Sequence, residues 1–212
     1  MKTRSIIDTE FVVRSIAETA IENEDVFCEL DSVVGDGDFG YSLARGFEKV
    51  LEEWDAFDRT DSSVFLKKIA HMITSRIGGT SGPLWGTAFL RASTAVRGHD
   101  TVSGTDVVAM LRAAVEGIKE RGKSDVGDKT LLDALVPAID ALEVAVALGL
   151  SFEETLDAAA KAAREAADAT SSLQAKRGRA SYTGERSIGS PDAGAVAVAV
   201  IFERLTSQSR AR

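Results

Sequence analysis

Apolar residues recur along most of the chain at intervals of three and four positions, the spacing that places them on one face of an α-helix. One run, 195–201, could pass for a buried strand, but Asp192 before it is a good helix cap. We therefore predict an all-α protein with eight helices. They run from about 8 to 30, from 39 to 57, from 61, from 83, from 105, from 127 to 148, from 151 to 174 and from 192 to 205.

Two of these helices carry local signals of where they begin. Ser151 and Glu154 have the spacing of a capping box, in which each side chain binds a free backbone N–H group at a helix start. Pro137 lies inside the helix predicted from 127 to 148. Because proline lacks a backbone N–H and clashes with the preceding turn, it predicts a late start or a kink.

The composition limits the class of protein. The 212 residues suffice for one core, and no linker-like run divides them, so we predict a single domain over residues 1–212. A net charge of -8 without a basic stripe argues against nucleic acid as a partner. The single cysteine, Cys28, suits a reducing compartment. Since no signal peptide or membrane-spanning run is seen, we expect a soluble, cytoplasmic protein that binds no membrane.

The candidate chemistry is concentrated between the first two predicted helices. Asp31, Asp36 and Asp38 place three carboxylates close together, and Gly35 and Gly37 let the backbone turn them inward. Like charges at this spacing repel each other unless a cation lies among them. Carboxylate oxygens are the ligands that Mg²⁺ and Ca²⁺ prefer. An acidic surface turn is the alternative interpretation.

A calcium-binding loop of the helix–loop–helix type fits this stretch badly. With Asp36 as its first position, Gly40 would be the fifth-position ligand, Tyr41 would replace the required glycine and Phe47 the required glutamate. Mg²⁺ is therefore the better candidate, and Mg²⁺ usually accompanies phosphate groups.

A glycine-rich stretch, 78–83, precedes the fourth predicted helix. Glycines before a helix and a proline in its first turn are typical of an open N-terminus with unpaired N–H groups, which binds anions. The hydroxyl groups of Thr80 and Ser81 could bind a phosphate or a metal there. An ordinary helix cap is the alternative.

Residues 117–124 match the letter pattern of the phosphate-binding P-loop. That motif requires a strand before it and a helix after it. Here an amphipathic helix comes before the match, and Asp-Val-Gly-Asp comes after it in place of a helix. We therefore reject a P-loop. No Ser/His/Asp or Cys/His arrangement and no Cys/His metal spacing is found either.

Residues 176–189, called the lid segment below, are basic, rich in glycine and without helical periodicity. Loops of this length inside a compact domain often serve as lids over a site. Arg179 and Arg186 could bind a nucleotide phosphate. Solvated surface charges are the alternative.

Four segments together have a specific family pattern. They are Gly-Asp-Gly-Asp at 35–38, Gly-Gly-Thr-Ser-Gly-Pro-Leu-Trp-Gly at 78–86, Arg-Gly-Lys and Gly-Asp-Lys-Thr within 121–130, and Gly-Arg-Ala-Ser-Tyr-Thr-Gly-Glu-Arg-Ser-Ile-Gly at 178–189. In this order and spacing they closely resemble the nucleotide-binding L subunit of dihydroxyacetone kinases (DhaL), over nearly the whole chain. The resemblance implies an antiparallel barrel of eight helices with the nucleotide and two Mg²⁺ ions at one end.

The resemblance also implies a role for individual residues. Asp31, Asp36 and Asp38 would be the Mg²⁺ ligands and, with Arg179 of the lid segment, the catalytic residues. The residues implied in binding the nucleotide are Phe39, Gly40, Tyr41, Ser42, Thr80, Ser81, Gly122, Leu131, Arg179, Asp192, Ala193 and Gly194.

The implied reaction is phosphoryl transfer to a ketose such as dihydroxyacetone. The donor is either ATP or a bound ADP that has been rephosphorylated. In the family a separate K subunit (DhaK) holds the ketose through a histidine, so this chain alone would be inactive. The branch fed by a phosphoenolpyruvate phosphotransferase usually has His and Asn where this chain has Phe39 and Ser42. This difference favours ATP as an exchangeable donor. The alternative is a tightly bound ADP, rephosphorylated by a phosphotransferase M subunit.

Several further alternatives stay open. The acceptor could be dihydroxyacetone or a related ketose such as erythrulose. The chain could instead act as a nucleotide-dependent binding module for a transcription regulator, or phosphorylate another carrier-held substrate as in fatty-acid kinases. The intact lid segment argues for a ketose kinase. Whether the chain forms a homodimer is also open.

Overall fold

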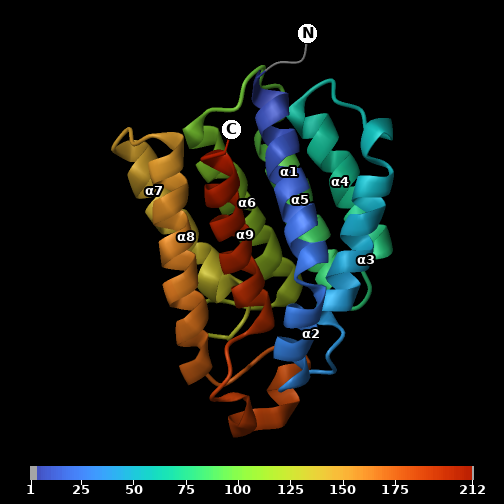
Figure 1. The fold of residues 1–212 in the computed structure, drawn as a ribbon, viewed down its shortest axis with the longest axis vertical. Helices are drawn as coiled ribbons and strands as arrows, with labels where there is room; N and C mark the ends of the chain where they lie inside the picture. The colour runs from blue at the N-terminus through green and yellow to red at the C-terminus, as the bar shows by residue number, and fades with distance from the viewer. Residues whose placement is uncertain (1–3, 212) are drawn as a thin grey trace. The chain divides into compact units, whose positions relative to one another are not determined.

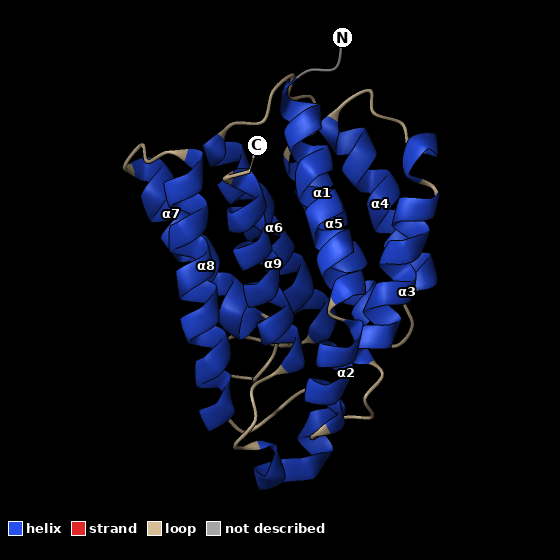
Figure 2. Ribbon diagram, viewed as in Figure 1, coloured by secondary structure: helices blue, strands red, loops and turns tan. Residues whose placement is uncertain are grey.

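The computed structural model describes residues 4–211, and the side chains of residues 8–211. Within this range the chain forms nine α-helices and three short 3₁₀-helices, and Figure 2 shows no strand among them. The predicted all-α class is confirmed. The α-helices, labelled in Figure 1, are α1 (Arg4–Glu22), α2 (Glu24–Ser32), α3 (Phe39–Glu52), α4 (Ser62–Arg76), α5 (Ser81–Ala95), α6 (Gly104–Gly122), α7 (Leu132–Ala147), α8 (Phe152–Ala169) and α9 (Ala193–Ser209). The 3₁₀-helices are η1 (Trp54–Ala56), η2 (Thr170–Ser172) and η3 (Arg179–Ser187).

The first predicted helix is in fact two helices. α1 ends at Glu22 and α2 begins at Glu24, because Asn23 leaves the helical region with φ -107° and ψ 18°. Asparagine is a poor helix former, since its side chain competes for backbone hydrogen bonds. The prediction of one helix from 8 to 30 was wrong at this point, which adds one helix to the expected eight. The barrel arrangement stays a prediction.

The packing contacts divide the chain into two compact units. The first comprises the residues up to Glu22 together with Ser42–Gly122, and the second comprises Asn23–Tyr41 together with the residues from Lys123 onward. The single domain over residues 1–212 stays a prediction.

In the first unit, α5 packs against both α4 and α6. Its core is aromatic: Phe47 is fully buried and meets the ring of Trp85 edge-on, with 6.2 Å between ring centroids. α4 and α5 approach closely at Gly86, where a Cβ atom would lie 1.9 Å from Thr74 Oγ1. Asp61 accepts a hydrogen bond from the N–H of Val64 at 2.8 Å and so caps α4.

In the second unit, α8 packs against α7 and α9, and α9 also contacts α2. The contact face of α8 is built from small residues, since Ala159, Ala163 and Ala167 are fully buried. Alanine leaves the backbones of neighbouring helices close together, because no larger side chain separates them. The alanine-rich pattern of the sequence therefore corresponds to close helix packing.

The predicted helix starts of the second unit are confirmed. Ser151 and Glu154 form the capping box, with both reciprocal hydrogen bonds present at 3.2 and 2.9 Å. α7 begins only at Leu132, the late start that Pro137 predicted. Asp192 caps α9 by accepting a hydrogen bond from the N–H of Ala195 at 2.8 Å.

Two segments differ from their sequence patterns in detail. The lid segment contains η3, a 3₁₀-helix interrupted at Gly184, whose φ of 60° and ψ of -131° are not helical. The P-loop letter match falls mostly inside α6, which ends at Gly122, so its glycines form no phosphate-binding loop.

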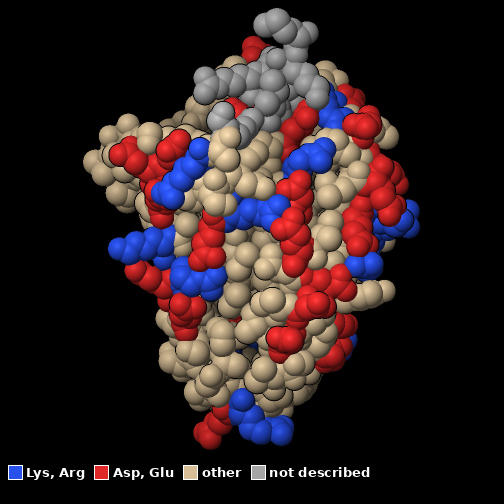
Figure 3. All heavy atoms as spheres, in the orientation of Figure 1, with Lys and Arg blue, Asp and Glu red and all other residues tan. Residues whose placement is uncertain are grey.

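The surface of the described residues carries both signs of charge. On the face shown in Figure 3, acidic and basic side chains are interspersed, in keeping with the net charge of -8 and the absence of a basic stripe in the sequence. None of the described helices combines the length and the hydropathy needed to cross a membrane.

Candidate metal and nucleotide site

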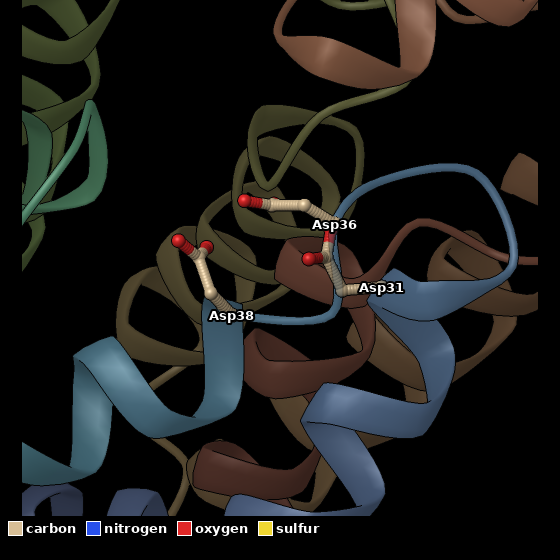
Figure 4. Close-up of side chains that lie close together, drawn as sticks. All are labelled: Asp31, Asp36 and Asp38. Carbon is tan, nitrogen blue, oxygen red and sulfur yellow. The ribbon is translucent and has the colours of Figure 1, made fainter.

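The three predicted acidic ligands meet at the junction of α2 and α3, within the second unit. Asp31 lies in the last turn of α2, Asp36 in the following loop and Asp38 directly before α3. Figure 4 shows their carboxylates pointing toward one another, and one oxygen from each lies within 4.8 Å of the others. Asp31 is half-buried, whereas Asp36 and Asp38 are exposed. An incoming ion can therefore reach the cluster from solvent.

Two glycines make this loop possible. The N–H of Gly35 donates to the carbonyl oxygen of Asp31 at 2.6 Å, and a Cβ atom at Gly35 would lie 2.3 Å from Asp31 Oδ1. Gly37 has a φ of +74°, a left-handed conformation that glycine adopts at little cost. Any other residue at position 35 would push the Asp31 carboxylate out of its place in the cluster.

The first turn of α3 lies directly on α2. Gly40 is buried, and a Cβ atom there would lie 2.1 Å from the carbonyl oxygen of Glu24. The N–H of Tyr41 donates to Cys28 Sγ at 3.2 Å, and the ring of Phe39 lies 6.0 Å from that of Phe27. These contacts fix the two helix ends that carry Asp31 and Asp38. The side chain of Tyr41 is exposed.

One cation of the chain already lies at the cluster. The guanidinium group of Arg179, at the start of η3, forms an ion pair with Asp36. Three carboxylates and one guanidinium leave two formal negative charges, which a divalent cation would balance. The lid segment thus brings its arginine to the residues predicted as metal ligands.

The predicted residues at the starts of α7 and α9 also lie together. Leu131 directly precedes α7, and a Cβ atom at Gly194 would lie 3.2 Å from its Cβ. Ala193 is buried in the first turn of α9. Burial raises the pKa of Asp192 to about 7, although the hydrogen bond from the N–H of Ala195 lowers it. The nearby charges act in both directions, since an aspartate raises this pKa and a lysine lowers it.

The remaining predicted residues belong to the first unit. Thr80 is exposed before α5 and makes no side-chain capping bond, and Ser81 is half-buried as the first residue of that helix. Ser42 lies in α3, and Gly122 is the last residue of α6. The predicted residues therefore fall into two groups, one in each unit.

Sequence reasoning missed a buried polar network in residues 127–133. Lys129 and Asp133 are buried, and the Asp133 carboxylate accepts hydrogen bonds from the N–H groups of Gly127 at 2.5 Å and Thr130 at 2.7 Å. Burial raises the pKa of Asp128, but the N–H of Asp125 and the Arg177 charge outweigh this effect and hold the pKa below its usual value. The Gly-Asp-Lys-Thr motif was visible in the sequence, but nothing local shows that its lysine is buried.

Comparisons with known proteins support this fold and show the family of the chain. Residues 33–207 match the DAK2 domain family. An Escherichia coli K12 protein, "PEP-dependent dihydroxyacetone kinase, ADP-binding subunit DhaL", is 40% identical over 176 residues, which are 83% of this chain and 84% of that protein. The L-erythrulose kinase of Pectobacterium atrosepticum is 36% identical over 182 residues, 84% of this chain but 30% of that protein.

The fold also matches a solved structure. The dihydroxyacetone kinase from C. freundii, in complex with AMP-PNP and Mg²⁺, has a TM-score of 0.76 and 25% identity over 94% of this chain and 33% of that chain. Fold and site together define an all-α protein with a carboxylate cluster suited to a hard cation. The chain belongs to the DAK2 domain family and, within it, to the L subunits of dihydroxyacetone kinases.

Proposed function

We propose that this chain is the nucleotide- and Mg²⁺-binding subunit of a two-component ketose kinase. It transfers a phosphoryl group from the nucleotide to a ketose held by a separate K-type subunit. The observation that carries this proposal is the convergence of the Asp31, Asp36 and Asp38 oxygens within 4.8 Å in a chain of this family. The solved relative in complex with AMP-PNP and Mg²⁺ supports the same chemistry.

The residues present fit Mg²⁺. The cluster offers only oxygen ligands, which a hard cation prefers, and its two exposed members leave room for water and phosphate oxygens in the coordination shell. Asp31, Asp36 and Asp38 would hold two ions. When bound, the metal supplies charge neutralisation between the phosphates and at the transferred group.

The protein's own contribution is positioning. Arg179 lies at the carboxylates, and its planar guanidinium can bind a phosphate with two parallel hydrogen bonds. We assign it to the nucleotide phosphates, with Asp36 released to the metal. Thr80 and Ser81 at the start of α5 would bind phosphate through N–H and hydroxyl groups. This assignment requires both units to act as one domain.

The rest of the nucleotide would be bound by residues at helix ends. Those assigned to it are Phe39, Gly40, Tyr41, Ser42, Gly122, Leu131, Asp192, Ala193 and Gly194. Backbone groups at helix ends suit this task because several of them have no partner within the helix. The acceptor would be dihydroxyacetone or erythrulose, the substrates in the names of the relatives.

The phosphate donor separates two versions of this function. Phe39 cannot donate a hydrogen bond to a phosphate as a histidine would, which favours exchangeable ATP. The second candidate is a tightly bound ADP that a phosphotransferase M subunit rephosphorylates. It is favoured by the 40% identity to a PEP-dependent, ADP-binding subunit.

Native mass spectrometry of the purified chain, without added nucleotide, tests the donor. An empty protein that gains ATP and Mg²⁺ on titration would support exchangeable ATP. Stoichiometric ADP with Mg²⁺ would establish the second candidate. An empty protein that takes up neither would contradict the proposed function and favour a binding module for a regulator.

Asp38→Asn tests the metal assignment. We expect Mg²⁺-dependent nucleotide binding to weaken by about tenfold or more, because even residues behind a metal ligand change affinity by that much. The circular dichroism spectrum should not change, since Asp38 is exposed. Asp25→Asn is the matched control, an exposed carboxylate on α2 outside the cluster. Equal affinities of the two variants in calorimetric titration would refute the assignment.

An assay with a purified K-type subunit tests the reaction itself. We expect no ketose phosphate from this chain alone, and turnover when the K subunit, nucleotide and Mg²⁺ are combined. Turnover by the isolated chain would contradict the two-component proposal.

A further inference from the structure

Lys129 is a buried lysine whose ammonium group donates hydrogen bonds to three backbone carbonyl oxygens. Its exposed fraction is 3%, and its Nζ donates to the carbonyl oxygens of Leu173 at 3.1 Å, of Ser190 at 2.7 Å and of Ser187. An ammonium group has three N–H donors, so these three acceptors match it completely. A charge this deeply buried is costly unless it is satisfied in this way.

The three acceptors mark the two sides of the lid segment. Leu173 precedes the segment, Ser187 ends η3 inside it, and Ser190 follows it directly. One side chain therefore joins the point where the chain leaves α8 and η2 to the point where it returns toward α9. Figure 1 shows this stretch, coloured orange, beyond the end of α8. Arg179 lies between the joined points.

Lys129 itself is held rigidly. Its backbone φ is 61°, an unusual value for a residue other than glycine. It lies inside the loop that Asp133 fixes through the N–H groups of Gly127 and Thr130. Asp133 belongs to the buried first turn of α7. The backbone on either side of Lys129 is thus tied to α7, and its ammonium group reaches from there to the lid segment.

Neighbouring contacts join the same loop to the lid segment. The N–H of Lys176 donates to the carbonyl oxygen of Asp128 at 3.0 Å, and Arg177 Nε donates to the Asp128 carboxylate at 3.1 Å. Ser187 Oγ accepts the N–H of Ala175 at 2.9 Å, which brings the two sides of the segment together. The far part of the segment is open, with Tyr182 exposed by 89%.

We propose that Lys129 is a positioning residue that fixes both sides of the lid segment, so that Arg179 is held at the carboxylate cluster. Its effect on nucleotide affinity rests on the proposed function, whereas its effect on the lid segment does not. The ordinary alternative is a lysine that only contributes to the global stability of the second unit.

Lys129→Met removes the donors and the charge at nearly the same side-chain length. We expect amide hydrogen exchange to accelerate in residues 174–190 but not in α8, and trypsin to cleave faster after Arg177, Arg179 and Arg186. Lys161→Met is the control, an α8 lysine that is 78% exposed. A uniform acceleration over the whole unit, or no local change, would overturn the proposal in favour of a role in stability alone.

Nucleotide binding gives the second readout. In a Mg²⁺-nucleotide titration we expect Lys129→Met to weaken affinity about tenfold, the range for residues that position a binding group. If Lys129 acts through Arg179, the double variant Lys129→Met/Arg179→Ala should bind no more weakly than Arg179→Ala. Additive losses of nucleotide affinity in the double variant would show that Lys129 does not act through Arg179. Absence of binding in the native chain would contradict the proposed function, while the exchange data would still test the lid segment.

The native protein supplies a test that needs no variant. The N–H groups of Ala175, Lys176 and Gly189 are hydrogen-bonded at the base of the lid segment. They should exchange much more slowly than the N–H groups of residues 180–185. Equal exchange rates at the base and in the open part would overturn the proposal, even if Lys129→Met does not fold.

Discussion

Replacing Gly40 with alanine would test the contact that holds Asp38 beside Asp31. A Cβ atom at Gly40 would lie 2.1 Å from the carbonyl oxygen of Glu24 and 2.8 Å from the backbone nitrogen of Cys28, where ordinary contact begins at 3.4 Å. Both atoms belong to the backbone of α2 and cannot rotate away. The first turn of α3 would have to move by about 1 Å, as overpacked sites do.

The sign of the stability change follows from two opposing effects. In an exposed helix the substitution would stabilise by about 1 kcal/mol, because alanine is the better helix former. Overpacking costs about 1–3 kcal/mol, and separating the helices weakens the Phe27–Phe39 ring contact, worth about 0.5–1.5 kcal/mol. We expect a net loss of about 2 kcal/mol in the free energy of unfolding, or about 4–8 °C in Tm.

Thermal unfolding followed by circular dichroism measures this loss. Lys49→Ala is the control in the same helix, since its side chain is 44% exposed and its surface pair with Glu52 contributes little. Gly40→Ala should also weaken Mg²⁺ binding, because the ends of α2 and α3 carry the ligands. An unchanged or higher Tm would refute the close approach of these helices.

Two further predictions concern stability in the second unit. The pKa of Asp192 is about 7, against an ordinary 3.8. Between these two pH values the folded protein holds a proton that the unfolded chain has lost. The stability that this proton contributes is lost as the pH rises through 7. Asp192→Asn can still cap α9, so its gain in Tm over the native protein should be larger at pH 8 than at pH 5, and an equal gain would contradict the raised pKa. Ser151→Ala removes one half of the capping box and should cost about 1 kcal/mol in urea unfolding, whereas no change would mean that the Glu154 bond suffices.

Much of the fold was predictable from the sequence because its signals are local. Helical periodicity predicted the all-α class, and the structure confirms the caps at Ser151 and Asp192 and the late start before Pro137. Each of these depends on residues within one or two turns. The family motifs are equally local, and the family is shown by the comparison.

The candidate site was predictable in part for the same reason. Asp31, Asp36 and Asp38 are neighbours along the chain, and two glycines between them limit how their loop can fold. Their spacing therefore predicted the convergence that the structure shows. The roles of the other predicted site residues came from the family resemblance, because residues far apart in sequence carry no pattern that joins them.

Only the tertiary structure decided the burial and pairing of distant groups. Lys129 binds oxygens 44 to 61 positions later in the chain, so its burial cannot be read from its neighbours. The raised pKa of Asp192 comes first from burial, and the need for glycine at Gly40 comes from another helix. A sequence determines periodicity and caps through short-range contacts, whereas burial and close approach depend on which elements the folded chain brings together.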